Sequence, residues 1–434
     1  TSDTRGVTRM SYGPGEEIAH AMVRREAEAL GLNIETDAAC NLYVTLPGQS
    51  DAPSIVVGSH LDSVPMGGNF DGAAGVLMGL SVLSGLVNAG RTPLRSITVM
   101  AIRAEESAWF SASYIGSRAA FGRLTGAELD SVVRAGDGVT LGQAITAAGG
   151  RIDDIASGCA HWNPTDVAVF LEPHIEQGPV LAMKDTALGI VTDIRGSIRF
   201  RQAVCRGVYA HSGATPRAAR RDAVSAVSTL VVELDALWRQ FEKQGKDLTV
   251  TVGEISTDPE EASFSKVAGV VRFSLDIRSN SRATLDAFAA ELKAVTTAIE
   301  KDRNVSFDFG PSTSTRPSKM NSAVISGLGR AAMSLGQPVL EMPCGAGHDA
   351  ATFAGLGVPT GMLFIRNENG SHNPDEHMDL ADFRAGAAVR MRFCLAPPDI
   401  PRGPIVLSCS PSPTAASSCC AAPVSRSSRR RRRI

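Results

Sequence analysis

Imidazole and carboxylate side chains follow a short apolar run near the start of the chain and are of the kinds that bind a divalent metal. Residues 55–57, Ile-Val-Val, predict a buried strand, and His60 and Asp62 come soon after it. Asp71 follows a Gly/Pro turn at the predicted capped start of a helix, where its carboxylate can point back at the strand end. Ligands of open α/β sheets bind beyond the carboxyl ends of the strands. These three side chains therefore form a candidate metal site if other strands supply further ligands.

Three further predicted strands run into side chains of the same types. The side chains are Glu105 and Glu106 after residues 96–102, His174 after residues 166–171, and His372 after residues 359–365. Histidine, Asp and Glu without Cys are typical of hydrolytic sites for Zn²⁺, Mn²⁺ or Co²⁺. Because the strands are predicted to belong to one sheet, these side chains are expected to meet at one edge.

The number of candidate ligands indicates two metal ions, because one tetrahedral ion needs fewer. We expect Asp71 to bridge the ions, with His60 and Glu106 on one and His174 and His372 on the other. A water molecule between two such ions has a lowered pKa and becomes a nucleophile at neutral pH.

Glu105 and Asp62 are expected to support the site without binding the metal ions. Neighbouring side chains diverge, so Glu105 and Glu106 are expected to divide the work. Glu106 would bind metal, while Glu105 takes the proton from the water and passes it to the leaving nitrogen. Asp62 can accept the second N–H of the His60 ring and fix its orientation. Taken alone, a Glu-Glu pair is usually a solvated loop, so this interpretation depends on the other ligands.

The elements that must position these residues form two predicted domains, as 434 residues exceed one ordinary core. Strands alternate with helices over residues 1–192 and again over 313–396, which predicts an α/β metallohydrolase domain with a mainly parallel sheet. Residues 193–312 follow the order β-α-β-β-α-β, the ferredoxin-like arrangement. We therefore expect this smaller domain to be inserted into the larger one.

Composition limits the partners and the compartment. The chain is 43% hydrophobic and 20% charged with a formal net charge of −2, which gives no reason to expect a nucleic-acid or membrane partner. No apolar run is long enough to span a bilayer, and no secretory signal begins the sequence. The eight cysteines lack paired spacing, which favours free thiols in a reducing compartment such as the cytoplasm.

The last residues differ in character from the rest. Residues 397–434 are rich in Pro, Ser, Ala and Arg and end in an arginine run, so they are expected to form a disordered tail. An arginine run can also serve as a nuclear-targeting or polyanion-binding tag. A translation-frame artefact is a further alternative.

Seven segments form a more specific pattern. They are HLDSVPMGGNFDGAAGV (60–76), AEESAWF (104–110), LEPHIEQGPVL (171–181), HSGATP (211–216), LDIRS (275–279), GAGHDA (345–350) and GSHNPDE (370–376). Together they resemble the hydantoinase/carbamoylase amidases, which include N-carbamoyl-L-amino acid hydrolase, allantoate amidohydrolase and ureidopropionase. These belong to the aminoacylase and glutamate-carboxypeptidase-like dimetal hydrolases. HIEQGPVL is the most specific segment of the seven.

The resemblance implies the same five metal ligands, Glu105 as general acid/base, and four further roles. Gln177 matches a substrate-contacting position, and Arg278 matches the arginine that binds the substrate carboxylate. His211 matches a lid-domain histidine that reaches the reaction centre of the partner subunit and stabilises the oxyanion. His348 is expected near the substrate in a supporting role.

The activity implied is metal-dependent hydrolysis of the C–N bond of an N-carbamoyl or ureido substrate that bears a carboxylate. The resemblance also implies a homodimer formed through the inserted lid domain. Residues 264–269 replace an Asn-containing stretch of the family, and residues 107–110 depart from its usual Gly-Ser-Arg-Phe, which leaves the substrate open. The alternatives are a dimetal aminoacylase or peptidase of the same superfamily and a catalytically silent truncated member.

Overall fold

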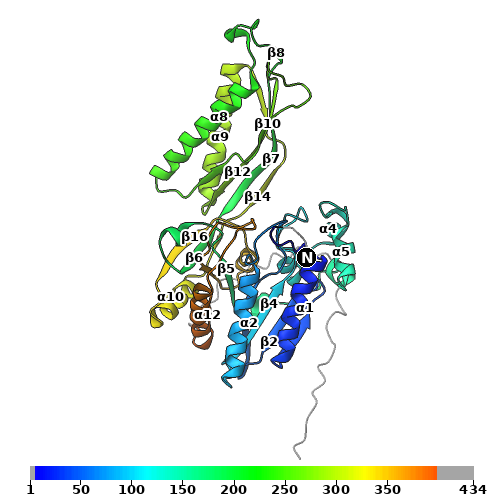
Figure 1. The fold of residues 1–434 in the computed structure, drawn as a ribbon, viewed down its shortest axis with the longest axis vertical. Coiled ribbons are helices and arrows are strands. Elements are labelled where there is room, and N and C mark those ends of the chain that lie inside the picture. The colour runs from blue at the N-terminus through cyan, green and yellow to red at the C-terminus, as the bar shows by residue number, and fades with distance from the viewer. Residues whose placement is uncertain (1–4, 398–434) are drawn as a thin grey trace, which may run out of the picture.

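The computed structural model describes residues 5–397, so the predicted tail lies, apart from Pro397, outside the described residues. Two bodies lie end to end along the longest axis of the molecule (Figure 1). The chain passes from the lower body to the upper one between Ile194 and Gly196, and it returns between Thr315 and Ser318. The lower body is therefore formed by the residues before and after the upper body, which is inserted between them in the sequence.

The lower body is built on a nine-stranded sheet. Its central strands run parallel, and they are β4 (Arg95–Ile102), β3 (Ser50–His60), β5 (Val167–Ile175) and β17 (Thr360–Ile365). The flanking strands add mostly antiparallel ladders, and they are β2 (Leu42–Leu46), β1 (Asn33–Thr36), β6 (Leu188–Ile194), β15 (Ser318–Lys319) and β16 (Val339–Cys344). The predicted α/β class with a sheet of mostly parallel strands is confirmed at the centre of the sheet.

Helices cover both faces of this sheet and bury its apolar side chains. One face packs against α1 (Pro14–Ala29), α2 (Ala73–Asn88), α10 (Ser322–Ser334) and α12 (Leu380–Leu395). The other packs against α3 (Ile115–Ala120) and α11 (Ala350–Gly355). Shorter helices are α4 (Gly126–Ser131), α5 (Leu141–Ala147), α6 (Ile152–Ala156) and α7 (Val180–Met183). Burial on both faces explains why the central strands are continuous apolar runs in the sequence.

The upper body has a six-stranded antiparallel sheet with the order β10-β12-β7-β13, to which β14 and β9 add. Its strands are β7 (Gly196–Arg206), β9 (Thr249–Thr251), β10 (Ile255–Thr257), β12 (Val270–Ser279), β13 (Ser306–Asp308) and β14 (Ser312–Thr315). Helices α8 (Ala223–Lys243) and α9 (Arg282–Arg303) cover one face. A separate two-stranded ladder joins β8 (Ala210–His211) to β11 (Lys266–Val267).

Two predicted boundaries are wrong. Strand β5 continues to Ile175, because residues 170–175 pair in parallel with β17, so His174 lies inside the strand and not after it. The sequence of residues 218–241 also predicts a helix, but α8 begins at Ala223, because a 3-10 helix follows Pro216 and Asp222 caps α8. Within residues 5–397, no helix has both the length and the apolar character needed to cross a membrane.

Candidate metal centre

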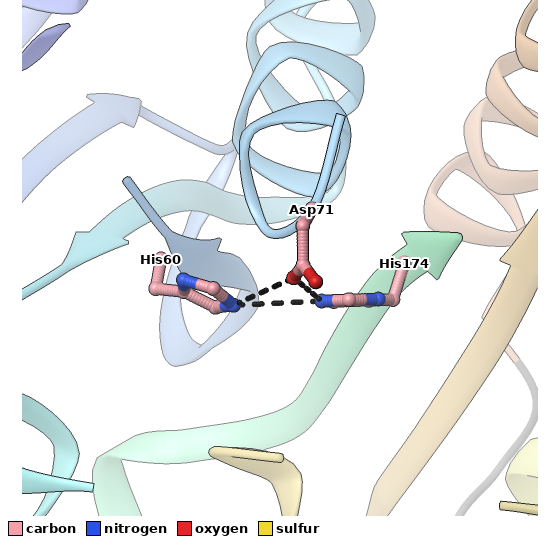
Figure 2. Close-up of side chains that lie close together, drawn as sticks. All are labelled: His60, Asp71 and His174. Carbon is pink, nitrogen blue, oxygen red and sulfur yellow. Dashed lines mark hydrogen bonds and ion pairs between the residues drawn. The ribbon is translucent and has the colours of Figure 1, made fainter. Parts of the chain in front are cut away.

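Asp71 lies at the centre of a cluster of histidines at the carboxyl edge of the large sheet. Its Oδ1 is 3.5 Å from Nε2 of His60 and 3.2 Å from Nε2 of His174, as Figure 2 shows. Its Oδ2 is 3.3 Å from Nε2 of His372, which in turn lies 3.5 Å from Oε1 of Glu106. Side chains from four distant parts of the sequence thus meet around one carboxylate.

The backbone at Asp71 directs its carboxylate toward the histidines. Asp71 does not cap α2 as the sequence suggested, because Gly72 occupies the N-cap position with φ +63°. A Cβ at Gly72 would lie 2.5 Å from the His60 ring, so only glycine fits there. His60 ends β3 and His174 lies near the end of the adjacent parallel strand β5, which brings their Nε2 atoms to 3.5 Å.

The hydrogen bonds of the rings suit metal binding. His174 Nδ1 donates to the carbonyl of Ile175 at 2.9 Å, and its Nε2 accepts from the N–H of Gly72 at 3.2 Å. His60 Nδ1 lies 3.1 Å from the carbonyl of Asp62. Oδ1 of Asp71 is buried and has no hydrogen-bond partner among the described residues. Lone pairs of nitrogen and oxygen that converge on a buried position fit a divalent cation.

Three overlapping sets of residues could each bind a metal ion, because the ligand atoms within each set lie within 4.8 Å of one another. They are His60, Asp71 and His174; Asp71, Glu106 and His372; and His60, Glu105 and Glu106. The first two sets share Asp71 and fit two ions bridged by its carboxylate. They group His60 with His174, which come from adjacent strands, and Glu106 with His372, whereas the third set keeps His60 with Glu106 as predicted.

Asp62 positions residues from two strands at once. Its oxygens accept hydrogen bonds from the backbone N–H groups of Glu105 and Glu106, at 3.2 and 3.1 Å, and from the Ser11 hydroxyl at 2.6 Å. Its Oδ1 also lies 3.3 Å from Nδ1 of His60. The predicted contact between Asp62 and His60 is therefore present. Asp62 also holds the backbone of Glu105 and Glu106 in place.

The segment before Glu105 is held by a residue that the sequence did not single out. Ala104 has φ +51°, a left-handed conformation that is unfavourable for a side chain with a Cβ. Glu16, buried at the start of α1, accepts from the N–H groups of Ala104 and Tyr12 at 3.2 and 2.7 Å. It also accepts from Arg103 Nη1 at 2.9 Å. Helix α1 thus stabilises the turn that presents Glu105.

The carboxylates of the cluster have shifted pKa values. Burial, with the charge of Asp71 nearby, raises the pKa of Glu106 to about 7, and burial raises the pKa of Glu105 well above its usual range. Burial alone would raise the pKa of Asp71 too, but the imidazole rings of the three nearby histidines hold it well below the usual value. Burial opposes the charged form of His60, yet hydrogen bonds with Asp62 and Asp71 raise its pKa. The carboxylate of Asp71 is therefore the one of these three carboxylates that most favours its charged form.

Two of the predicted substrate residues lie beside the cluster. Gln177 Nε2 donates to Oδ2 of Asp71 at 2.8 Å and lies 3.5 Å from Nε2 of His372. The ring of His348 is 4.3 Å from that of His174, centroid to centroid. Neither ring nitrogen of His348 has a hydrogen-bond partner in the described part of the chain. Burial lowers the pKa of His348 well below its usual value, so its ring is neutral.

The other two predicted residues belong to the upper body. Arg278, in β12, donates to the carbonyl of Gly345 at 2.7 Å and so bridges the two bodies. It also pairs with Asp276 at 2.7 Å. His211 is exposed in β8, at the end of the upper body farthest from the lower one (Figure 1), so a single chain does not bring it to the cluster. Its Nδ1 accepts from the N–H of Ala214 at 3.0 Å.

Two further polar residues support Asp71 and were missed. The Ser371 hydroxyl lies 2.7 Å from Oδ2 of Asp71 and 2.6 Å from Oε2 of Glu376. Glu376, itself buried, accepts from the N–H groups of Phe70 and Asp71 at 2.9 and 3.2 Å. Both residues belong to the segment GSHNPDE beside His372, and that proximity was the available signal.

A mostly parallel sheet with three histidines and several carboxylates at its carboxyl edge defines an α/β protein of the metallohydrolase class. The chain belongs to peptidase family M20/M25/M40, whose family model matches residues 56–396. It is 33% identical to an N-carbamoyl-L-amino-acid amidohydrolase of Paenarthrobacter aurescens, over 90% of this chain and 93% of that protein. It is 31% identical to an allantoate amidohydrolase of Escherichia coli K12, over 88% and 90% of the two chains.

A solved structure supports the same placement. The chain superimposes on a hydantoinase/carbamoylase family amidase from Burkholderia multivorans with a TM-score of 0.82 and 29% identity, covering 91% of this chain and 93% of the other. The resemblance expected from the seven sequence segments is therefore confirmed.

Proposed function

We propose that the protein is a metal-dependent amidohydrolase that cleaves the C–N bond of an N-carbamoyl or ureido group in a small molecule bearing a carboxylate. The convergence of three histidines and Asp71 beside the buried Glu105 carries this proposal. The relatives named for N-carbamoyl-L-amino acids and allantoate point to the bond that is cleaved.

The residues present fit two divalent ions of the Zn²⁺, Mn²⁺ or Co²⁺ type. His60, Asp71 and His174 would hold one ion, and Asp71, Glu106 and His372 would hold the other. Such ions, when bound, lower the pKa of water and polarise a carbonyl group.

The chain's own residues supply the proton transfers and the orientation of the substrate. Glu105, a buried carboxylate next to the ligand Glu106, takes a proton from the attacking water and delivers it to the leaving nitrogen. Gln177 and the neutral His348 present polar atoms to the substrate beside His174. Arg278 offers a planar guanidinium that suits a bidentate carboxylate.

We assign the upper body, close to the predicted residues 193–312, the role of a lid that also forms a homodimer. This arrangement would let His211 of one subunit stabilise the oxyanion in the other. It is supported by the exposure of His211 and by its distance from the cluster of its own chain. A cytoplasmic enzyme without nucleic-acid partners fits the composition of the chain.

A substrate panel tests the activity. Protein loaded with Mn²⁺, Co²⁺ or Zn²⁺ should hydrolyse N-carbamoyl-L-amino acids, allantoate or ureidopropionate in preference to N-acetyl amino acids and dipeptides. The variant Glu105→Gln should keep its metal and lose about 10²- to 10⁴-fold in kcat. A preference for N-acetyl or dipeptide substrates would favour an aminoacylase or peptidase, the activity for which the family model is named. Absence of bound metal and of turnover would indicate a silent member.

A further inference from the structure

A cavity of about 800 Å³ lies in the upper body, between the start of α8 and the end of α9. It is lined mainly by polar residues, among which arginines predominate. The arginines are Arg217, Arg220, Arg221 and Arg303. Asp222 and Asp302 are the acidic residues in its lining, so the formal charge of the lining is +2.

The arginines are incompletely neutralised by their neighbours. Arg303 Nη1 donates to the Ser225 hydroxyl at 2.6 Å, while its buried Nε has no hydrogen-bond partner within residues 5–397 and lies 3.9 Å from the nearest Asp302 oxygen. Arg221 faces the side-chain amide of Asn304, whose oxygen can accept from Arg221 Nε at 3.0 Å when the amide is turned to suit its neighbours, and this acceptor is neutral. Asp222 already accepts from the N–H of Ser225 as the N-cap of α8. Guanidinium donors therefore remain available to a ligand.

We propose that this pocket binds a phosphate-type oxyanion carried by a small molecule. Guanidinium groups form short, charge-assisted and often bidentate hydrogen bonds with phosphate oxygens, and several arginines can engage one tetrahedral group from different sides. Like charges held together in a cavity repel one another, and a dianion removes that cost. The cavity has the size of a small-molecule site and exceeds a bare phosphate, which leaves room for an attached organic group.

The pocket is connected to the segment that carries His211. Arg220 lines the pocket and donates to the carbonyls of Thr215, at 3.0 Å, and Ser212. His211 in turn accepts from the N–H groups of residues 213 and 214. A bound oxyanion would fix Arg220 and with it the loop that follows His211.

Isothermal titration of the metal-loaded protein with inorganic phosphate and pyrophosphate tests the proposal. The double variant Arg217→Gln/Arg303→Gln should lose one binding event or weaken it at least ~10-fold, while any binding at the metal centre persists. The control Arg239→Gln/Arg282→Gln removes the same charge from paired, exposed arginines of α8 and α9 outside the pocket and should bind as the wild type does.

Other outcomes overturn the proposal. Unchanged binding in the pocket variant, or an equal loss in the control variant, would show that the arginines act only through net charge or not at all. Succinate binding as tightly as pyrophosphate would exclude a phosphate-type site. If the double variant melts at a lower temperature than the wild type, Arg217→Gln alone decides, because Arg217 is exposed.

Discussion

The lower and upper bodies contribute to the candidate active site in different ways. In the lower body, the buried carboxylate of Asp62 accepts hydrogen bonds from two backbone N–H groups and a hydroxyl group. It also contacts the ring of the candidate ligand His60. In the upper body, His211 is exposed, and its ring nitrogen Nδ1 accepts hydrogen bonds from N–H groups of its own loop. The difference teaches that one chain by itself gathers the candidate metal ligands, whereas His211 would reach such a cluster only if a second subunit brought it there.

Removing the central ligand should have the largest effect. Asp71→Asn replaces the carboxylate that both ligand sets share, so we expect loss of at least one bound ion and a fall in kcat/KM of ~10³-fold or more. Metal analysis of the purified variant and steady-state kinetics measure both. The exposed Asp130→Asn serves as the matched control. Full activity with unchanged metal content would show that the cluster is not the catalytic centre.

Mixing inactive subunits tests whether the second half acts across a dimer. His211→Asn and Glu105→Gln should each be inactive as homodimers, but a refolded or exchanged mixture should recover about a quarter of wild-type activity, since heterodimers retain one intact site. Absence of recovery, with heterodimers demonstrated by differently tagged subunits, would place His211 outside catalysis or in the site of its own chain.

Arg278 should have a smaller, substrate-specific effect. Arg278→Met removes the proposed carboxylate contact, which predicts a KM increase of about 10- to 100-fold. The matched amide of the same N-carbamoyl amino acid, which lacks the carboxylate, should show little change between the wild type and the variant. Equal losses on both substrates would indicate that the bond from Arg278 to Gly345 matters for the junction of the bodies instead.

The smallest effect concerns stability in the lower body. Asp349 is fully buried, and one of its oxygens has no hydrogen-bond partner in the described chain. Burial raises its pKa to about 7, far above its usual value of 3.8. The folded state therefore binds this proton more tightly than the unfolded state does. The contribution of the protonated Asp349 to the free energy of unfolding is fully present below pH 3.8 and is lost as the pH rises through about 7.

Asp349→Asn cannot ionise and should not show this loss, which amounts to at most about 1.4 kcal/mol per pH unit. Denaturant unfolding of both proteins from pH 4 to 8 should show the variant gaining relative stability as the pH rises. A constant difference across that range would mean that the carboxyl group is ionised throughout.

Much of the lower body could be predicted from the sequence because its ligands lie near the ends of strands that have clear apolar runs. Residues 55–57 are wholly buried in β3, and parallel pairing brings the ends of β3 and β5 together. The strand β16 was not predicted, since its sequence, Val339–Cys344, alternates weakly and contains Pro343. The continuation of β5 to Ile175 depends on pairing with β17, which lies far along the chain.

The supporting residues of the site could not be predicted for a similar reason. Glu16 looks like an ordinary acidic residue in the first turn of a helix, and its role follows only from contacts with Ala104 and Arg103. Which ligands would share a metal ion likewise depends on strand order, because neighbouring strands bring His60 close to His174. Residue types indicated the chemistry, and long-range packing decided the partners.

The bond from Glu16 to Arg103 has a consequence for how the chain folds. A buried carboxylate without its partner is destabilising, so we expect α1 to be held firmly in its final position only when Arg103 is present. We therefore expect α1 to dock together with β4 and the turn beyond it. The turn that presents Glu105 should form in the same step as the docking of α1.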